Sequence, residues 1–168
     1  MPTKAIVDSQ SVKNSDYANK KYKGYDGGKK VGGIKRHLMT DTDGLPLDIR
    51  ITPANVSERD ACFQILLDKE ELIQKLEEVY ADSGYNGERF ELEVYYETGV
   101  IITIVPRNKN KKHEFSVVPK RWIIERSFSW LDKCRRLWKN TERLAKTSKT
   151  MIELCFIRLL ARRFGSMS

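Results

Sequence analysis

Short apolar runs separated by polar turns predict strands in the first two thirds of the chain. The run of Ala5, Ile6 and Val7 predicts a strand that is buried on both faces. Two later runs flank the sequence Asp-Thr-Asp-Gly at 41–44, which is typical of a tight hairpin turn. In all, the pattern predicts five strands, over residues 4–8, 34–40, 45–52, 79–82 and 100–105.

Helical periodicity and end signals predict four helices. Ser57 is suited to cap the first helix, and Gly99 is suited to stop the second. Pro119 suits the first turn of the third helix, where its missing N–H costs nothing. The helices are predicted over residues 57–69, 88–97, from 119 onward and 147–164. Their order among the strands predicts an α/β fold, with a mixed five-stranded sheet flanked by helices on both faces.

The segment 13–33 lacks both kinds of pattern. It holds five of the ten glycines, many lysines and almost no aliphatic side chain, so we expect a long basic loop. Lys29 and Lys30 belong to this segment. Such a loop either follows a DNA backbone or is simply solvated, and its composition favours neither explanation.

The charge balance indicates a polyanionic partner. The 168-residue chain has 31 Lys and Arg against 23 Asp and Glu, which gives a net charge of +8, and its pI is about 9.4. Nucleic acid is a frequent partner of such basic proteins. The length suits a single domain, over residues 1–168, with one core.

The compartment signals argue against export and against membranes. No apolar run approaches the roughly 20 residues that a membrane-spanning helix needs, and the N-terminus lacks a signal-peptide pattern. The three cysteines form neither an even framework nor a CxxC pair, which favours a reducing compartment. We therefore expect a cytoplasmic protein without a membrane partner.

Three carboxylates stand out within this basic chain. Asp8 and Asp82 come where apolar strands end, and Glu125 lies inside an amphipathic helix pattern. Carboxylate oxygens are natural Mg²⁺ ligands, and a basic surround attracts phosphates. From the residues alone, a turn or cap role is the better explanation of Asp82, and Glu125 is equally explained as a surface residue paired with Arg121 or Ser129. Asp8 needs a partner, because it ends a buried strand.

Several motifs in a fixed order resemble one family. These are VDSQSVK, GYDGGKKVGGIKRHLMTDTDGLPL, ADSGYNG and RWIIERSFSWLDKCRRLWKNTER, and the resemblance covers residues 4–163. They resemble the catalytic half of bacterial insertion-sequence transposases of the DDE superfamily, in the branch called insertion-sequence-five-like. The resemblance implies a ribonuclease-H-like fold and a nucleoid-associated, cytoplasmic location.

The resemblance also implies a metal site and a reaction. By position, Asp8, Asp82 and Glu125 match the family's catalytic, metal-binding triad. The triad would hold two Mg²⁺ ions, with Asp8 between them and with Mn²⁺ able to substitute. Water would cut the DNA at the element's end, and the freed 3′-hydroxyl would then attack the target DNA. The implied partners are double-stranded DNA, as transposon ends and target, and further copies of the chain in a homo-oligomer.

Residues that contact DNA are less well defined by the motifs. Arg121 fits the family's arginine, one helical turn before the glutamate, whereas Val118 replaces its tyrosine. The lysine position falls on Asp132, so Lys133 beside it is the predicted substitute. Predicted contacts also come from basic residues after the last strand and in the glycine-rich segment, at Arg107, Lys109, Lys29 and Lys30.

The start of the chain bears on whether it carries its own DNA-binding region. Only seven residues precede Asp8, so we expect the N-terminal helical DNA-binding region of the family to be absent and a separately encoded reading-frame product to be a candidate partner. Three functions therefore stay open. The chain is an active transposase domain with endonuclease and strand-transfer activity, a truncated non-catalytic DNA-binding fragment that inhibits transposition, or a ribonuclease-H-like nuclease.

Overall fold

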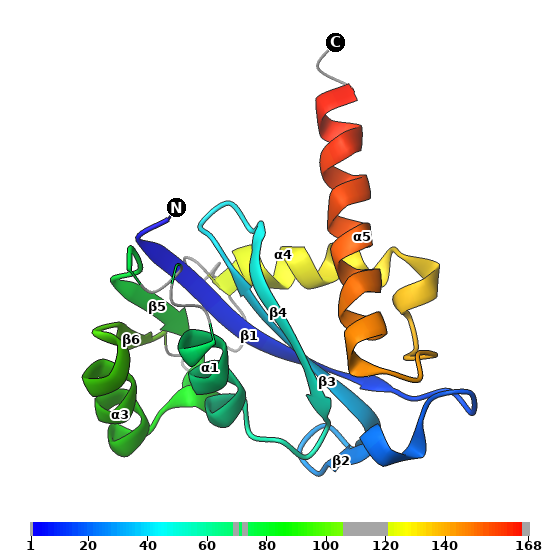
Figure 1. Cartoon of the computed structure of the whole chain (residues 1–168), viewed down its shortest axis with the longest axis horizontal. Helices are drawn as coiled ribbons and strands as arrows, with labels where there is room; N and C mark the ends of the chain where they lie inside the picture. The colour runs from blue at the N-terminus through cyan, green and yellow to red at the C-terminus, as the bar shows by residue number, and fades with distance from the viewer. Residues whose placement is uncertain (1, 69–70, 72–73, 106–120, 166–168) are drawn as a thin grey trace, which may run out of the picture. The chain divides into compact units, whose positions relative to one another are not determined.

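The computed structural model describes residues 2–68, 71, 74–105 and 121–165 (Figure 1). The strands are β1 (Lys4–Lys13), β2 (Gly24–Asp26), β3 (Val31–Thr40), β4 (Pro46–Pro53), β5 (Glu78–Ala81) and β6 (Ile101–Ile104). The helices are α1 (Glu58–Leu67), α3 (Glu88–Thr98), α4 (Arg121–Asp132) and α5 (Ala145–Gly165), with short 3-10 turns η1 (Lys20–Tyr22), η2 (Ser83–Tyr85) and η3 (Arg135–Leu137). The chain forms two compact units. Unit 1 comprises residues 1–9, 37–49 and 57–127, and unit 2 comprises 10–36, 50–56 and 128–168.

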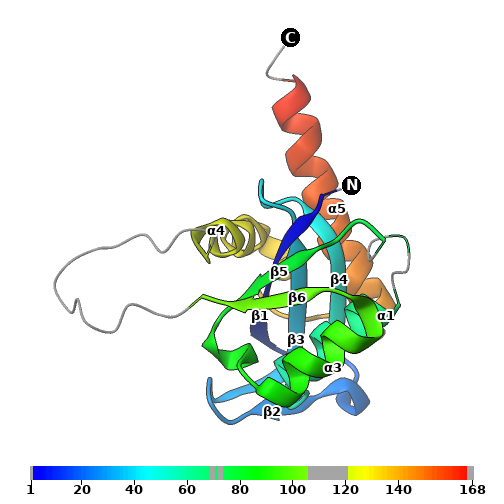
Figure 2. The ribbon, with the colours of Figure 1, turned by 90° about the vertical axis from the view of Figure 1, so that its left-hand side faces the viewer.

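The strands form one mixed sheet in the order β2-β3-β1-β5-β6, with β4 paired to β3. Strands β1, β5 and β6 run parallel, and Figure 2 shows β5 and β6 side by side. Strands β2 and β3 are antiparallel, with Gly24 opposite Gly33. The prediction of a mixed sheet is confirmed. The predicted number of five strands is wrong, because the described residues form six.

The missing strand is β2, inside the segment that was predicted to be a loop. Gly24 of β2 and Gly33 of β3 are needed because backbone atoms pass close to them. Glycines do not contribute to a periodic pattern of apolar side chains. A Cβ on Gly33 would lie 2.0 Å from the carbonyl oxygen of Val12, and a Cβ on Gly24 would lie 2.6 Å from the backbone nitrogen of Ala54. A strand built on such contacts is hidden from a pattern of apolar and polar positions.

The core of unit 1 lies on one face of its parallel strands. Alternate residues of β1 and β5 point to this face, where α1 and α3 cover them. The buried cluster includes Ala5, Val7, Val79, Ala81, Ile65, Leu66, Phe90 and Val94. Ile6 and Tyr80, which alternate with these residues, share a cavity with Ile124 of α4 on the other face. Helices therefore cover both faces, as the sequence predicts.

The helix ends follow local signals. Ser57 caps α1, because its hydroxyl accepts hydrogen bonds from the backbone N–H groups of Arg59 and Asp60. Gly99 ends α3 in a left-handed conformation, with a φ of 71°. The predicted start of the third helix at Pro119 lies outside the described residues.

The hairpin turn before β4 is bonded to α4 within unit 1. The Asp41 carboxylate accepts hydrogen bonds from the backbone N–H groups of Asp43 and Leu45, each at 2.9 Å. On the α4 side, Ser127 donates its hydroxyl to the carbonyl of Gly44 at 2.8 Å. Arg126 likewise donates to the carbonyl of Asp43 at 2.7 Å. The turn therefore fixes the middle of α4.

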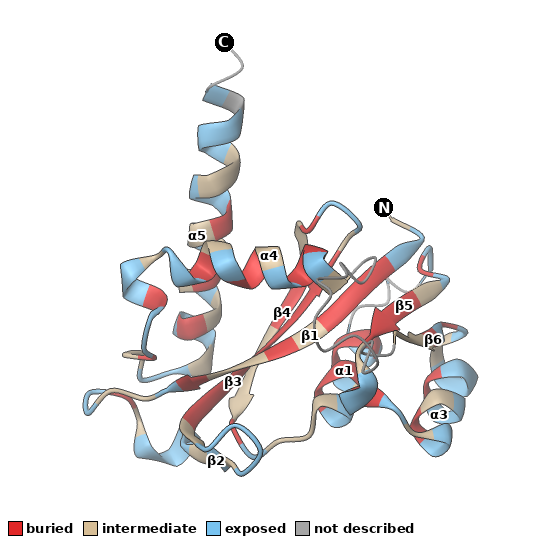
Figure 3. Cartoon of the chain, turned by 180° about the vertical axis from the view of Figure 1, so that it is seen from behind, coloured by how far each residue is buried: buried red, intermediate tan, exposed pale blue. Residues whose placement is uncertain are grey.

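Unit 2 is held together by packing of α5 and by buried hydrogen bonds. Ile152 and Phe156 of α5 are buried, while Figure 3 shows exposed surface along the helix's C-terminal half. Arg36 is buried and donates to the carbonyl of Leu137 at 2.8 Å, and burial lowers the pKa of its guanidinium to about 10. Within the described ranges, no helix is long and apolar enough to cross a membrane.

Candidate active site

Asp8 lies in β1 and is half-buried. Its Oδ1 accepts a hydrogen bond from the backbone N–H of Ser9 at 2.7 Å. Because side chains alternate along a strand, Asp8 shares the face of Ile6, opposite the core face of Val7. The strand thus presents one carboxylate on the side that α4 covers.

Asp82 directly follows β5 and is also half-buried. Its carboxylate caps η2 by accepting a hydrogen bond from the N–H of Gly84 at 2.9 Å, which is the turn role expected from the residues alone. The parallel register pairs Ile6 with Tyr80, and Asp8 and Asp82 each lie two residues further along. Neighbouring strands are about 4.8 Å apart. The two carboxylates therefore lie on neighbouring strands at the same level of the sheet. The prediction that Asp8 ends its strand is wrong, because β1 continues to Lys13 instead of stopping where its apolar run stops.

A small cavity joins the two aspartates. Asp8 and Asp82 both line it, with Ile124 and Arg121 supplied by α4. Its volume is about 10 Å³, near the smallest space that accepts one water molecule. The lining therefore combines two carboxylates and one guanidinium around a space for a single small species.

Glu125 is bound to Arg121 instead of lining this cavity. The guanidinium Nη2 lies 2.6 Å from Oε1 of Glu125, in an ion pair between residues one helical turn apart. The side chain of Glu125 is 53% exposed, whereas that of Arg121 is 21% exposed. This pairing is the surface role that the residues alone allowed for Glu125. Arg121 thus connects the cavity with the third carboxylate.

The predicted triad is brought together in part. Asp8 and Asp82 share the cavity, and Glu125 is linked to it through Arg121. Among the residues that the structure describes, no three His, Cys, Asp or Glu side chains lie close enough to hold a metal ion. Binding of a cation by all three would require Glu125 to turn from Arg121.

Tyr85 is a core residue close enough to be affected by the charges of both aspartates, and the sequence did not predict this. Its ring is buried, and its hydroxyl has no hydrogen-bond partner in the described part of the chain. Burial raises the pKa of Tyr85 well above its ordinary value, and the negative charges of Asp8, Glu58 and Asp82 add to the shift. The available signal was its position three residues after Asp82, which the 3-10 turn converts into proximity.

Glu58 is a second residue near Asp8 that the sequence did not predict. It begins α1, and its Oε1 accepts a hydrogen bond from the hydroxyl of Ser9 at 3.2 Å. Ser9 follows Asp8 in β1, so this contact ties the carboxylate-bearing strand to α1. In sequence, Glu58 is indistinguishable from an ordinary acidic residue in the first turn of a helix.

The chain also matches the sequence model of a known protein family. The sequence model of the family described as "Transposase DDE domain" matches residues 1–160. The chain belongs to this family. The DDE domain is also 32% identical over 129 residues to a protein of Burkholderia cepacia that is assigned as a transposase for insertion sequence element IS402. That alignment covers 73% of this chain and 60% of the relative, so the DDE domain spans less than two thirds of the longer protein.

Solved structures share the fold of the DDE domain at low sequence identity. One is a chain of the simian T-cell lymphotropic virus intasome in complex with the PP2A regulatory subunit B56 gamma. It has a TM-score of 0.56 and 11% identity, with 93% of this chain and 48% of that chain covered. Another is the catalytic core domain of BIV integrase, with a TM-score of 0.51, 12% identity and coverage of 94% and 82%. The fold is therefore ribonuclease-H-like, as predicted.

The predicted DNA-contacting residues of the DDE domain lie in different places. Arg121 lines the cavity in unit 1, and Lys133 lines a pocket in unit 2. Lys29 and Lys30 are exposed after β2, where the carboxylate of Asp26 accepts a hydrogen bond from the backbone N–H of Lys29. The remaining two, Arg107 and Lys109, lie outside the described residues.

Proposed function

We propose that this DDE domain is the catalytic part of a transposase that cleaves and joins DNA phosphodiester bonds at the ends of an insertion sequence. One observation carries the proposal. Asp8 in β1 and Asp82 directly after the neighbouring parallel strand β5 line one cavity with Arg121, in a chain of the transposase DDE domain family.

The side chains of the site suit a hard divalent cation. Asp8 and Asp82 offer carboxylate oxygens, the donors that Mg²⁺ prefers, and Glu125 would be the third ligand. When bound, Mg²⁺ or Mn²⁺ would activate the attacking oxygen and neutralise the charge that develops on the leaving oxygen. In the loaded enzyme, Asp8, Asp82 and Glu125 would together hold two such ions.

The chain's own residues would orient the reacting groups. The backbone N–H groups of Ser9 and Gly84 hold the carboxylates of Asp8 and Asp82 in place before any ligand arrives. Preorganised groups of this kind avoid a reorganisation cost during the reaction. Arg121 would donate to the scissile phosphate, for which its planar guanidinium is suited. Its release from Glu125 would free both side chains for these roles.

We extend the proposal to the partners. Double-stranded DNA would be bound as transposon ends and as target, and copies of the chain would assemble on it. Charge supports the DNA assignment, since the net charge of +8 favours a polyanion.

The experiment that tests the proposal is strand cleavage of a labelled duplex. The duplex carries the ends of the insertion element that encodes the chain, and Mg²⁺ or Mn²⁺ is added. We expect Asp8→Asn and Asp82→Asn to lower the cleavage rate by about 10³-fold or more, because each removes a charged metal ligand. Asp60→Asn is the matched control, since Asp60 is an exposed carboxylate on α1 of the same unit.

Two results would contradict the proposal. The first is DNA binding without cleavage by the wild-type chain under any of these conditions, which favours a non-catalytic fragment that inhibits transposition. The second is cleavage confined to the RNA strand of an RNA–DNA hybrid, which favours a ribonuclease-H-like nuclease.

A further inference from the structure

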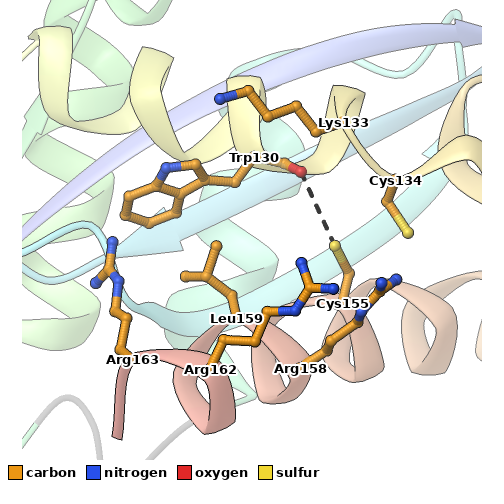
Figure 4. Close-up of a pocket in the computed structure, with 8 residues that line it drawn as sticks. All are labelled: Trp130, Lys133, Cys134, Cys155, Arg158, Leu159, Arg162 and Arg163. Carbon is orange, nitrogen blue, oxygen red and sulfur yellow. Dashed lines mark hydrogen bonds between the residues drawn. The ribbon is translucent and has the colours of Figure 1, made fainter. Parts of the chain in front are cut away.

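Unit 2 contains a pocket of about 400 Å³ beside the end of α4 and the C-terminal half of α5 (Figure 4). Four cationic side chains line it, namely Lys133, Arg158, Arg162 and Arg163, and it shares no residue with the cavity of Asp8 and Asp82. We call it the basic pocket.

The arginines of the pocket lie in a stripe along one side of α5, at a spacing that in most surface helices marks the side facing the core. Positions 155, 158, 159, 162 and 163 follow the spacing i, i+3, i+4, i+7 and i+8, which places them on one side of a helix. In an ordinary surface helix this stripe is apolar. Here it carries three arginines with one leucine and one cysteine, and no residue from 157 to 163 is buried. The stripe is therefore a basic side of α5 that forms part of the pocket lining.

Every charged side chain that lines the basic pocket is positive. None of its lining residues is an aspartate or glutamate. In the described part of the chain, Lys133, Arg158 and Arg162 form no ion pair with a carboxylate. Burial and a hydrogen bond with Cys134 raise the pKa of Cys155 to about 11, so this thiol stays neutral at physiological pH. Nothing in the lining offsets the charges of Lys133, Arg158 and Arg162.

An aromatic wall holds one of these cations in place. The guanidinium of Arg163 stacks on the ring of Trp130, 4.5 Å from its centroid. The thiol of Cys155 is 4.0 Å from the carbonyl oxygen of the same tryptophan, so α4 and α5 are in contact at the base of the pocket (Figure 4). A guanidinium positioned in this way loses less conformational entropy when it binds an anion.

We propose that the basic pocket binds phosphate groups of the sugar–phosphate backbone of duplex DNA. Guanidinium groups match phosphate oxygens in charge and in geometry. Arg158 and Arg162 are about 6 Å apart along the helix axis, a length that contains about two phosphates of one DNA strand. The identity of the polyanion as DNA rests on the proposed function, whereas the capacity for phosphate rests on the pocket alone.

Binding of a labelled duplex by the full chain tests this inference, measured by fluorescence anisotropy in EDTA over about 50–200 mM salt. The double variant Arg158→Gln/Arg162→Gln removes two charges from the pocket. We expect it to weaken binding roughly tenfold and to reduce the slope of log K against log salt by about two. The matched control is Arg143→Gln/Lys146→Gln, which removes two exposed charges of unit 2 outside the pocket.

The outcomes separate a pocket from a diffuse basic surface. Equal losses in the two double variants would overturn the inference. So would saturable binding of inorganic phosphate, abolished by the pocket variant, without any change in duplex binding, because the ligand would then be a free anion. Arg158→Lys/Arg162→Lys keeps the charge and should retain most of the binding. All four substituted side chains are exposed, so circular dichroism should show folded variants.

The test is independent of catalysis. It is made without divalent metal, so the carboxylates of unit 1 do not enter the measurement. A chain that binds duplex through the pocket but never cleaves it would contradict the proposed function alone. A chain that cleaves DNA, and whose pocket variants bind normally, would contradict this inference alone.

Discussion

The buried hydroxyl of Tyr85 is a cost to stability. Its ring belongs to the core cluster of unit 1, and the hydroxyl has no hydrogen-bond partner among the described residues. Leaving such a group unsatisfied costs about 1–3 kcal/mol. Tyr85→Phe should therefore raise the free energy of unfolding by about 1 kcal/mol, measured by urea denaturation at neutral pH.

The same substitution should change the alkaline limb of stability. Tyr85 stays neutral in the folded state above pH 10, because its pKa is raised, while the tyrosine of the unfolded chain ionises. Wild-type stability should thus fall above pH 10 more steeply than that of Tyr85→Phe. Tyr95→Phe, at a 52% exposed position, is the control and should change neither curve. Destabilisation by Tyr85→Phe would show that the hydroxyl is hydrogen-bonded.

At the scale of elements, Glu78 ties together three parallel strands. It lies in β5 and accepts hydrogen bonds from Tyr80 of the same strand, from Thr103 of β6 at 2.7 Å and from Lys4 of β1, whose Nζ lies 3.1 Å away. These contacts, that of Tyr80 first, lower the pKa of Glu78 to about 2. The ionised carboxylate is therefore favoured by the folded state.

The expected effect of Glu78→Gln depends on pH. The unfolded glutamate protonates near pH 4.5 and the folded one near pH 2, so the stabilisation is complete above pH 4.5 and is lost as the pH falls towards 2. The difference in free energy of unfolding between wild type and Glu78→Gln should follow this window in denaturant titrations. Glu77→Gln, at the exposed neighbouring position, should leave the pH dependence unchanged. A difference that stays constant down to pH 2 would contradict the assignment.

The hairpin before β4 should be sensitive at Gly44. This glycine has a φ of 83°, and a Cβ placed on it would lie 2.8 Å from the hydroxyl of Ser127 in α4. A side chain in the left-handed region costs about 1–2 kcal/mol, so Gly44→Ala should lower the free energy of unfolding by at least that amount. Gly27→Ala is the control, because a Cβ there meets no atom within 4 Å. Equal effects of both substitutions in urea denaturation would contradict this account.

At the scale of the whole molecule, divalent metal should stabilise the fold. A ligand that binds only the folded state at about ten times its Kd adds about 1.4 kcal/mol, which corresponds to roughly 3–6 °C in Tm for a chain of this size. Mg²⁺ should raise the Tm of the wild type by this amount in differential scanning fluorimetry. The rise should be absent in Asp8→Asn and retained in Asp60→Asn. An equal rise in all three would place the bound ion elsewhere.

Much of the fold was predictable because its signals are local. Ser57 and Gly99 mark helix ends by their own chemistry, and the apolar runs of β1 and β5 mark buried strands. The proximity of Asp8 and Asp82 also followed from the sequence, because the family fold places the strands that carry them next to each other, although β1 continues beyond Asp8 to Lys13.

The rest depends on contacts between distant residues. Strand β2 exists because backbone passes close to Gly24 and Gly33, which no periodicity records. The burial of Tyr85 beside the carboxylates depends on the turn after β5. The arginines of α5 read as ordinary basic residues of a helix end, and only the packing of α5 against Trp130 makes them line a pocket.

The glycine pairing of β2 also bears on self-association. In the strand order of the described residues, β2 lies at one end of the sheet, so one of its sides has no neighbouring strand. Exposed edges of this kind are templates for intermolecular pairing and aggregation. This edge is only three residues long and is bordered by the exposed lysines Lys23, Lys29 and Lys30. Short length and like charge both disfavour strand addition by another copy, so the basic segment also protects the sheet from edge-to-edge polymerisation.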